Sequence, residues 1–484
     1  MKRDVSFFRQ ALPSCRLYVS DTGSFYDISA PSLDGAFSLF DGTRCSVSID
    51  SKKIKRGQAF VALKGKRSDA HDFLKEALEN GASILVINES EVERLKEFTD
   101  SEYDFISIIV PDTFKALISL AKTWRSYFDI PIVGITGSIG KTTTKEMLRS
   151  IFDEAKVSAC VSFKNQNTNI GICLNIFNLR KEHKVAVFEL GINKKNEMAE
   201  LADILLPTMA LITGVAHVHT KGLGNIEGIA KEKKLIFKNF KNNNIGFVCG
   251  DNSQLSDSSY HHPVVKFGLR IKNHVQARKV KLIENDSISF TLKMYGKKEL
   301  VVLKTNHVGM VNNALAASSI AYFLQIPFAD IVKGLQQFDG FENRFEKRNL
   351  KRNQGVLISD CYNASPESMR AAIISFNGMQ SSGKKIVVLG DMLELGDKEI
   401  FWHRQIGRVL GKTDSFNSIV LVGERAKSIA KTAPVNMNVS CVENWQDAER
   451  VVSELLFKSE ANSLILVKAS RAMQLDKMVE KLIE

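Results

Sequence analysis

The sequence predicts an α/β protein of three domains, with a parallel sheet at its centre. Apolar runs such as IPIVGIT, KVAVFEL and MALITGVA alternate with amphipathic stretches, a pattern typical of a parallel sheet covered by helices on both faces. The alternation resumes near the C-terminus with GVLIS, KKIVVLGD, SIVLVGE and SLILVKAS. A chain of 484 residues also corresponds to about three domains when ~150 residues are assigned to each.

The three predicted domains follow differences in pattern along the chain. Residues 1–110 contain short mixed runs and a helical stretch ended by Gly81, which indicates a small α/β domain. Residues 111–340 contain the first series of alternating strands and helices and are expected to form a central domain. Residues 341–484 contain the second series and are expected to form a Rossmann-like α/β domain.

Composition narrows the class of protein without identifying a function. Hydrophobic residues make up 44% and charged residues 25%, which is ordinary for a globular protein, and no apolar run of 18 residues predicts a membrane-spanning helix. The seven cysteines include no C-x-x-C pair and the N-terminus lacks a secretory pattern, so we expect a cytoplasmic protein that is not embedded in a membrane. The net charge of +12 leaves three interpretations open, namely nucleic-acid binding, polyanionic ligands and solubility. Because no known nucleic-acid module is visible, we expect no nucleic-acid partner.

A glycine loop between a predicted strand and a predicted helix is the first candidate site. Residues 131–148 read PIVGITGSIGKTTTKEML, with an apolar strand, a loop that contains two glycines, and a helix with one apolar face. Such a loop points backbone N–H groups toward a phosphate, while the helix N-terminus and Lys141 add positive charge and Thr142 can offer its hydroxyl to Mg²⁺. The spacing is shorter than the common G-x-x-x-x-G-K-[ST] pattern, because Ile135 occupies the position of its first glycine. We therefore expect the central domain to be P-loop ATPase-like, with a ligand-free turn as the alternative.

Polar residues at other predicted strand ends form a second group of candidates. Glu189 lies within an apolar run, where an unpaired carboxylate would be costly unless a cation compensated it. His217 and His219 follow the strand of MALITGVA, and Lys233 falls near the apolar face of a helical stretch. Because the carboxyl ends of parallel strands meet at one sheet edge, the carboxylate and a histidine are expected to converge with the glycine loop. The alternatives are a salt bridge for Glu189, an ordinary imidazole for either histidine and a snorkelling side chain for Lys233.

Strand ends in the C-terminal series carry further polar residues. Asp360 ends the strand GVLIS, and Ser365 in the following YNASPESM is expected to cap a helix. The runs VVLGDMLELG and LVKASR place Asp391, and Lys468 with Arg471, at two more strand ends. Charged loop residues without a function are an equally good explanation for each of these positions.

The loop GITGSIGKTTTKEM resembles the ATP loop of the Mur ligases, whose form is T-G-x-x-G-K-[ST]. The resemblance covers nearly the whole chain after about residue 45, because the family's other motifs occur in order: DSKKIKRGQAFVALKGKRSDAHDF in its uridine-nucleotide domain, then NQNTNIGICLNIF, FELGIN, HTKGLGNIEGIAKEKKLIF, NNALAAS and VKASRAM. The motifs YNASPESM and VVLGDMLELGD are most similar to the member that adds a terminal dipeptide. The resemblance implies an ATP-dependent amide ligase of peptidoglycan synthesis, which joins D-alanyl-D-alanine to a UDP-N-acetylmuramoyl-tripeptide through an acyl phosphate.

The resemblance also implies roles for individual residues. ATP would be bound by the loop and by residues across the domain joint, namely Thr136, Gly137, Ser138, Ile139, Gly140, Lys141, Thr142, Thr143, Asn313, Arg344 and Asp360. Two magnesium ions would be held by Thr142, Glu189, His219 and Lys233. Lys141, His219 and Lys233 would be catalytic, and Lys233 matches the family's lysine that becomes N6-carboxylysine. The two substrates would be bound by Ser51, Lys52, Asn165, Asn167, Lys468 and Arg471.

Several positions depart from the family's usual pattern. Lys52 stands where an arginine is usual, so the charge is kept without the bidentate fork of a guanidinium. Gly309 and Met310 replace a His-Asn pair, Ser359 replaces the first of two aspartates, and Ala469 replaces a glycine. These departures concern single contacts and leave the overall resemblance intact.

Two other functions remain as alternatives. An earlier Mur enzyme or a folate polyglutamate ligase would share the loop and the fold, although YNASPESM disfavours the former and DSK…GQAFVAL the latter. A switch or motor ATPase would need no amino-acid substrate, but it should have the longer loop spacing.

The chain is expected to be a monomer. The sequence leaves open whether the third residue of the tripeptide is diaminopimelate or lysine, and it gives the first 40 or so residues no clear role.

Overall fold

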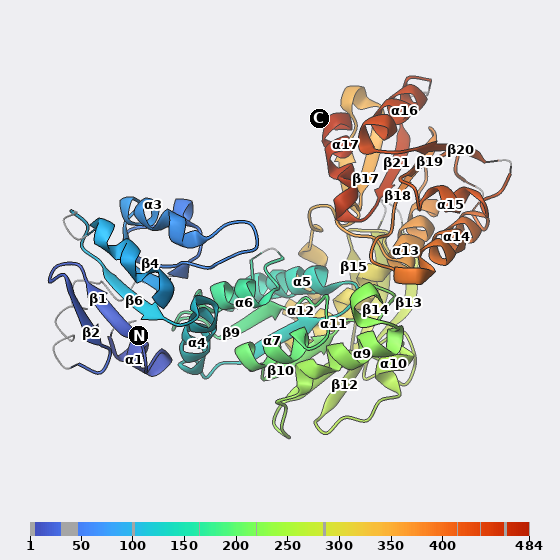
Figure 1. Ribbon diagram of the computed structural model, residues 1–484. Coiled ribbons are helices and arrows are strands. Elements are labelled where there is room, and N and C mark those ends of the chain that lie inside the picture. The colour runs from blue at the N-terminus through green and yellow to red at the C-terminus, as the bar shows by residue number, and fades with distance from the viewer. Residues whose placement is uncertain are drawn as a thin grey trace. The chain divides into compact units, whose positions relative to one another are not determined.

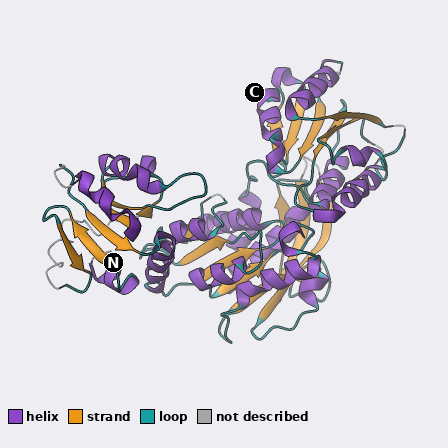
Figure 2. Ribbon diagram, in the orientation of Figure 1, coloured by secondary structure: helices purple, strands orange, loops and turns teal. Residues whose placement is uncertain are grey.

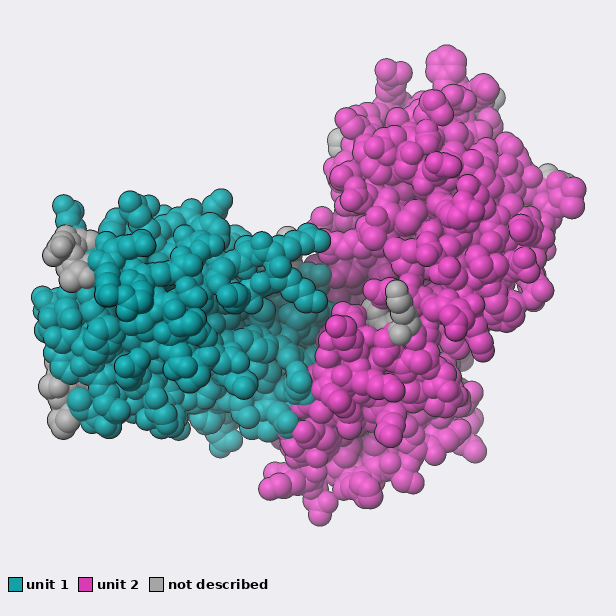
Figure 3. All heavy atoms as spheres, viewed as in Figure 1, with its two compact units in different colours: residues 1–132, 158–190, 200–207 teal, residues 133–157, 191–199, 208–484 magenta. Residues whose placement is uncertain are grey.

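The computed structural model describes residues 5–30, 47–98, 102–163, 165–218, 220–283, 287–413, 415–435, 437–458 and 462–483. The chain forms two compact units, which Figure 3 shows in different colours. The first consists of residues 1–132, 158–190 and 200–207, and the second of residues 133–157, 191–199 and 208–484. This division does not test the predicted domain boundaries after residues 110 and 340, which stay predictions.

Three β-sheets and the helices around them confirm the predicted α/β class (Figure 2). The sheets have six, nine and six strands. The first sheet belongs to the first unit and the third sheet to the second unit, whereas the nine-stranded sheet has two strands in the first unit and seven in the second. No helix of the described residues is long and apolar enough to cross a membrane.

The first unit is built on a six-stranded sheet in the order β2-β1-β6-β5-β4-β3. Strands β1, β2, β4 and β6 are labelled in Figure 1. Its strands are β1 (Arg16–Val19), β2 (Ser24–Asp27), β3 (Val47–Ser48), β4 (Gln58–Val61), β5 (Ala82–Asn88) and β6 (Ile106–Val110). Strands β3 to β6 are parallel, and β1 is antiparallel to both β2 and β6. The short helices of this sheet are η2 (Ser51–Lys53), η3 (Ala70–Phe73), α3 (Leu74–Glu79) and η4 (Glu89–Phe98). Phe60, Leu74 and Leu85 are among the buried residues of its core.

Helices α1 (Val5–Ala11) and α4 (Thr113–Ser126) also belong to the first unit and pack on each other. The carboxylate of Asp112 caps α4 by accepting from two backbone N–H groups, at 2.9 and 3.0 Å. The rings of Phe7 and Trp124 meet edge-on at 5.9 Å, so the start of the chain takes part in the core. The unit is completed by β8 (Ala159–Val161), α6 (Asn169–Ile176) and β9 (Val185–Glu189), with β8 parallel to β9. Helix α7 (Glu197–Leu205) is divided between the units.

The second unit begins with seven strands in the order β15-β14-β13-β12-β11-β10-β7. They are β7 (Ile132–Thr136), β10 (Met209–Ile212), β11 (Ile245–Cys249), β12 (Val264–Gly268), β13 (Val275–Ile283), β14 (Ser287–Met294) and β15 (Lys297–Leu303). The run from β7 to β13 is parallel, and β14 and β15 continue it as antiparallel hairpins. The helices are α5 (Lys141–Glu154), α8 (Thr220–Leu223), α9 (Ile226–Lys234), η5 (Leu235–Phe237), α10 (Ser253–Ser256), α11 (Gly309–Phe323) and α12 (Phe328–Gln337). Gly334 lets α12 approach α5 closely, because a Cβ there would lie 2.5 Å from the Cα of Ile151.

The third sheet has the order β16-β17-β21-β18-β19-β20, and all pairs are parallel except β16 with β17. Its strands are β16 (Glu346–Asn349), β17 (Gly355–Ser359), β18 (Lys385–Gly390), β19 (Ser418–Val422), β20 (Asn438–Val442) and β21 (Ser463–Lys468). Its helices are α13 (Pro366–Asn377), α14 (Glu399–Leu410), α15 (Lys427–Ala430), α16 (Trp445–Phe457) and α17 (Leu475–Leu482), with the short η6 (Lys351–Asn353), η7 (Gly396–Lys398) and η8 (Arg471–Met473). Two separate apolar clusters form its core, one with α13 and α14 and the other with α16 and α17. The alternating pattern of this region is therefore confirmed.

Candidate functional site

The glycine loop lies between the end of β7 and the start of α5, as predicted, and the segment after β10 holds it in place. The backbone N–H of Ser138 donates to the Gly214 carbonyl at 2.9 Å, and its hydroxyl bonds with the backbone of Ala216. Gly137 has a φ of 149°, and a Cβ at this position would overlap the hydroxyl of Thr213. The loop is thus a tight cradle of backbone groups at a helix N-terminus, which is the arrangement that binds phosphate.

The first residues of α5 add charge and hydroxyl groups to this cradle. Lys141 begins the helix, and its ammonium folds back to donate to the Gly137 carbonyl at 2.9 Å. Thr142 and Thr143 are buried at the same end of the helix. Gly140 caps α5 with a φ of 87°, and a Cβ there would overlap the side-chain oxygen of Asn313 on α11. The predicted ATP residues of the loop and Asn313 are therefore neighbours.

Lys233 is buried in α9, with only 2% of its surface exposed. Its ammonium does not reach water, so the snorkelling alternative is wrong. Burial, together with the charge of Lys141, holds the pKa of Lys233 well below its usual value, although Glu232 acts in the opposite direction. Lys233 is thus a lysine whose neutral form is favoured, close enough to Lys141 to feel its charge.

The two histidines of the same region have different outcomes. His217 lies with its Nδ1 atom 2.8 Å from a carboxylate oxygen of Glu367, at the start of α13. Its ring also packs on Trp402 of α14, with 4.4 Å between the ring centres. His219 lies outside the described residues, so its predicted role stays a prediction.

Glu189 and Asn167 lie together in the first unit. Glu189 ends β9 and is buried, and its side chain accepts a hydrogen bond from the Asn167 amide at 3.0 Å. Its backbone N–H donates to the hydroxyl of Ser162 at 3.1 Å. Asn165 is exposed, and its carbonyl accepts from the backbone N–H of Asn167 at 2.8 Å. A buried carboxylate oriented by an amide is well suited to hold a cation.

The carboxyl ends of β17 and β21 bring Asp360 and Lys468 into a buried ion pair. The Lys468 ammonium lies 2.6 Å from the Asp360 carboxylate and donates to the Asn363 carbonyl at 3.1 Å. The two residues had separate expected roles, one toward ATP and one toward substrate. In the structure each is the other's partner.

Two arginines of the same sheet edge lie around the ring of Tyr362. The Arg344 guanidinium stands 3.9 Å from the ring centre and the Arg471 guanidinium 5.5 Å from it. Arg344 also donates to the Thr142 hydroxyl at 3.5 Å, so it reaches from the third sheet to the phosphate cradle. Tyr362 is the first residue of the YNASPESM motif, and its contacts with the two arginines could not be predicted from the sequence.

Two neighbouring residues at these strand ends have structural explanations. Ser365 caps α13 as predicted, in a reciprocal pair of bonds with Ser368. Asp391 accepts from the backbone N–H of Ala426 at 2.8 Å and from Arg425 at 3.3 Å. The charged-loop alternative therefore suffices for Asp391.

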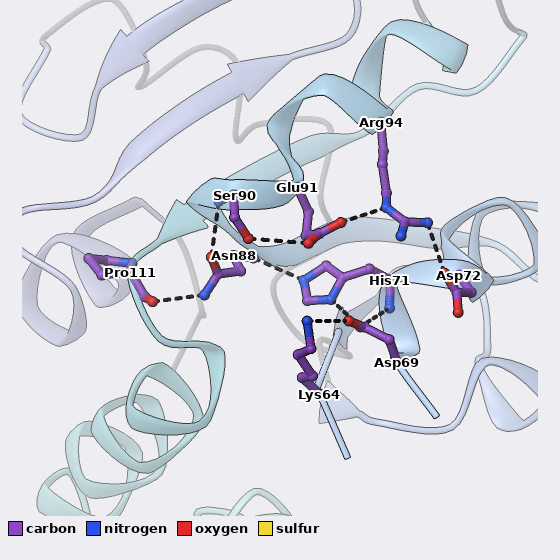
Figure 4. A network of polar contacts seen from close by, with 9 residues as sticks. All are labelled: Lys64, Asp69, His71, Asp72, Asn88, Ser90, Glu91, Arg94 and Pro111. Carbon is purple, nitrogen blue, oxygen red and sulfur yellow. Dashed lines mark hydrogen bonds and ion pairs between the residues drawn. The ribbon is translucent and has the colours of Figure 1, made fainter. Parts of the chain in front are cut away.

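In the first unit, Ser51 is buried and donates to the Glu76 carboxylate at 2.5 Å, while Lys52 is exposed. Sequence reasoning missed the neighbouring network around His71, which Figure 4 shows. The Nδ1 atom of His71 lies 2.6 Å from Asp69, and its Nε2 atom accepts from the backbone N–H of Asn88 at 3.0 Å. This network fixes the DAHDF segment to the end of β5, and the Asp-x-His spacing was the only signal in the sequence.

Family models match three consecutive segments of the chain. Residues 45–123 match the model described as "Mur ligase family, catalytic domain", residues 135–321 match "Mur ligase middle domain", and residues 343–471 match "Mur ligase, glutamate ligase domain".

Curated relatives match the chain over nearly its whole length. The UDP-N-acetylmuramoyl-tripeptide–D-alanyl-D-alanine ligase of Bacillus subtilis is 31% identical over 439 residues, which cover 90% of this chain and 93% of the relative. The ligase of the same name from Escherichia coli is 30% identical over 457 residues, which cover 93% and 96%.

Solved structures show the same architecture. A crystal structure of MurF from Acinetobacter baumannii superposes with a TM-score of 0.83 at 26% identity and covers 100% of this chain and 99% of that one. The MurF ligase of Thermotoga maritima, solved in complex with ADP, has a TM-score of 0.75 at 26% identity and covers 90% and 96%.

Proposed function

The chain belongs to the Mur ligase family, and we propose that it joins D-alanyl-D-alanine to the carboxylate of UDP-N-acetylmuramoyl-tripeptide at the expense of ATP. The product is UDP-N-acetylmuramoyl-pentapeptide, with ADP and phosphate, in peptidoglycan synthesis. One observation supports ligation most. A phosphate loop serves any ATP user, but here a lysine is buried beside Lys141 with its pKa held low. Pure ATP hydrolysis would not need that second lysine.

The reaction must convert an unreactive carboxylate into an acyl donor. An oxygen of the tripeptide carboxylate attacks the γ-phosphorus of ATP, the bond to the β-phosphate oxygen breaks, and ADP leaves. The amine of D-alanyl-D-alanine then attacks the carbonyl carbon of the acyl phosphate, and phosphate leaves as the amide forms. The protein's task is to position the groups and to stabilise negative charge.

The loop N–H groups and Lys141 would stabilise that charge on the phosphates. Arg344 already reaches the Thr142 hydroxyl at 3.5 Å and would add a second cation from the third sheet. Asn313, against Gly140, would contact the nucleotide beside the loop. Asp360 and Lys468 would act as a pair that shapes the sheet edge, with Arg471 nearby across the Tyr362 ring. Substrate contacts are proposed for Ser51, Lys52, Asn165, Asn167, Lys468 and Arg471.

Magnesium would neutralise the phosphate oxygens during transfer. Two residues supply hard oxygen ligands of the kind that such an ion prefers, the buried carboxylate of Glu189 in the first unit and the buried hydroxyl of Thr142 in the second. Glu189, Thr142, His219 and Lys233 remain the proposed ligands for two ions, as the family resemblance implies.

Lys233 is proposed to carry the N6-carboxylate. In this modification the neutral amine attacks the carbon of CO₂, an N–C bond forms, and one proton is released. The reaction needs the unprotonated amine, which burial and Lys141 favour. The product is an anion, so repulsion between two lysines becomes attraction, and its oxygens are ligands that magnesium prefers.

Chemical rescue of a Lys233 variant tests whether this lysine carries an N6-carboxylate. Lys233→Ala is expected to abolish ligation, and added short carboxylic acids should restore part of it. Lys231→Ala removes an exposed lysine of the same helix and is expected to leave activity unchanged. A carbamate signal in ¹³C NMR after incubation with ¹³CO₂ should appear in the wild type and be absent in Lys233→Ala. Full activity of that variant would reject the proposal.

Phosphate release with substrates added singly and together tests the ligation itself. Release should require both the UDP-linked tripeptide and D-alanyl-D-alanine, and tripeptides with diaminopimelate and with lysine should be compared. Turnover with ATP alone, or with an earlier precursor and a single amino acid, would contradict the assignment. We also propose that the protein is a monomer in the cytoplasm, the compartment that contains its nucleotide substrates.

A further inference from the structure

The antiparallel strands β13, β14 and β15 are labelled in Figure 1. One face of these strands is basic and is not used by the proposed reaction. Ala277 pairs with Leu292 across β13 and β14, and both are buried, so this row faces the core. Because side chains alternate along a strand, the next rows lie on the opposite side of the sheet. These rows are Gln276–Lys293–Lys298 and Arg278–Thr291–Leu300, in which Gln276 is itself buried against the loop before β13.

This face brings two lysines together on neighbouring strands. Lys293 of β14 and Lys298 of β15 are directly opposite each other, and both are exposed. Like charges in this cross-strand position destabilise a sheet. Within the described residues, neither lysine nor Arg278 forms an ion pair with a carboxylate. An anion from outside would remove this repulsion.

A loop beside this face exposes an isoleucine side chain to solvent. Ile271, between β12 and β13, is 77% exposed and is flanked by the exposed Arg270 and Lys272. The loop is nevertheless fixed, because the Asp251 carboxylate accepts from the backbone N–H groups of Leu269 and Arg270 at 2.6 and 3.0 Å. The same carboxylate accepts from the side-chain amide of Asn273 at 2.9 Å. An apolar side chain is therefore presented to solvent by a well-bonded backbone.

Hydrogen bonds join the loop to the basic sheet. The side-chain amide of Gln276 donates to the Ile271 carbonyl at 2.9 Å, and Gln276 is the direct neighbour of Lys293. Arg278 donates to the Leu269 carbonyl at 3.3 Å. The loop and the two outer rows thus form one continuous surface. We call it the basic face, and its members are Arg270, Ile271, Lys272, Arg278, Lys293, Lys298 and Leu300.

We propose that the basic face binds the anionic surface of a lipid bilayer. Clustered cations are attracted to anionic headgroups, and an exposed apolar side chain gains by entering the boundary between headgroups and acyl chains. Leu300, which is 55% exposed on the same face, adds a second apolar contact. A nucleic acid would satisfy the cations but would offer no apolar phase to Ile271. The lipid surface therefore fits both features of this surface.

Co-sedimentation of the full-length protein with vesicles tests this inference. Vesicles of phosphatidylcholine with about one third phosphatidylglycerol should bind the protein in a salt-sensitive manner, and pure phosphatidylcholine should bind it much less. Since each cation near an anionic membrane contributes about fivefold, the double variant Lys293→Gln, Lys298→Gln should bind about 25-fold more weakly. Ile271→Ser should weaken vesicle binding several-fold with all charges kept.

The matched control is Lys458→Gln with Lys481→Gln, which changes the net charge equally at exposed lysines of the third sheet region. It should bind vesicles like the wild type, and all variants should keep ligase activity. Failure of the wild type to bind anionic vesicles would overturn the inference, as would an equal loss in the control. Binding to polyuridylate that is lost with the two lysines but unaffected by Ile271→Ser would assign a nucleic acid instead and would also overturn it.

Discussion

The buried ion pair between Lys468 and Asp360 is expected to contribute to the stability of the third sheet, and this contribution can be measured. Lys468 is the last residue of β21, and 2% of its side chain is exposed. Its ammonium bonds to the Asp360 carboxylate at 2.6 Å and to the Asn363 carbonyl at 3.1 Å. The change to make is Lys468→Met, which keeps an unbranched side chain of nearly the same length and removes the charge.

The expected loss of stability follows from what remains after the change. Asp360 would keep a carboxylate in a buried position without its cation, and breaking a buried pair in this way costs about 3–5 kcal/mol. Adding Asp360→Asn removes the stranded charge, so the double variant should recover most of that loss. The coupling free energy between the two positions is then expected to exceed about 2 kcal/mol.

Urea unfolding measures these free energies if the fluorescence reports on the right region. The chain has three tryptophans, and Trp124→Phe leaves only Trp402 and Trp445, which flank the third sheet on α14 and α16. With a slope of about 2 kcal/mol per M, Lys468→Met should lower the midpoint by about 1.5–2.5 M. Lys458→Met, at an exposed lysine, should stay within about 0.5 kcal/mol of the parent. A loss below about 1 kcal/mol, or strictly additive effects in the double variant, would refute the reasoning.

Three further changes probe other parts of the second unit. Gly140→Ala places a methyl group at a φ of 87° and against Asn313, so the KM for ATP should rise at least about tenfold. The control is Gly296→Ala, at a φ of 81° in open space, which should leave the KM for ATP unchanged. Burial lowers the pKa of His403 below its usual 6.5, and both ring nitrogens bond to backbone groups. As the pH falls, His403 of the unfolded chain therefore binds a proton before His403 of the folded protein does. The free energy of unfolding should therefore fall as the pH drops below about 6.5, by up to ~1.4 kcal/mol per pH unit. In urea unfolding between pH 7 and 5, His403→Gln should lose this part of the dependence of the unfolding free energy on pH. An unchanged dependence in the variant would contradict the role of His403. Ser365→Ala removes the cap of α13 and should cost about 1 kcal/mol by the same method, whereas no loss would show that the capping box is dispensable.

The strands that could be predicted are those buried on both faces. Strands β9 and β18 are buried at every residue, and each is apolar except for one charged residue at its end, Glu189 in β9 and Lys385 in β18. The hairpin of β14 was missed although SISFTLKM buries every second residue from Ile288 to Met294. Its period of two was present in the sequence, but the polar residues that alternate with the buried ones (Ser287, Ser289, Thr291 and Lys293) broke the apolar run used to recognise strands.

The site could be predicted where its parts are close in sequence. The glycine loop is one segment, and its glycine spacing together with Lys141 sufficed to predict the turn before α5. Partners far apart were not predictable, because Lys468 and Asp360 are separated by 108 residues and His217 and Glu367 by 150. Their meeting depends on strand order, in which β21, the last strand, is inserted between β17 and β18. Alternation in the sequence indicates that strands exist but does not give that order.

Lys233 shows why burial, rather than residue type, decides the chemistry of this site. As a pattern, one lysine on an apolar helix face is ordinarily a stem packed on the core with its charge in water. The structure removes the water, and the charge of Lys141 adds to the cost of a second ammonium. Two outcomes relieve that cost, a neutral amine or conversion to an anion. The neutral amine is also the form that reacts with CO₂, so the burial that makes an ammonium unfavourable also favours the modification that would make Lys233 a ligand.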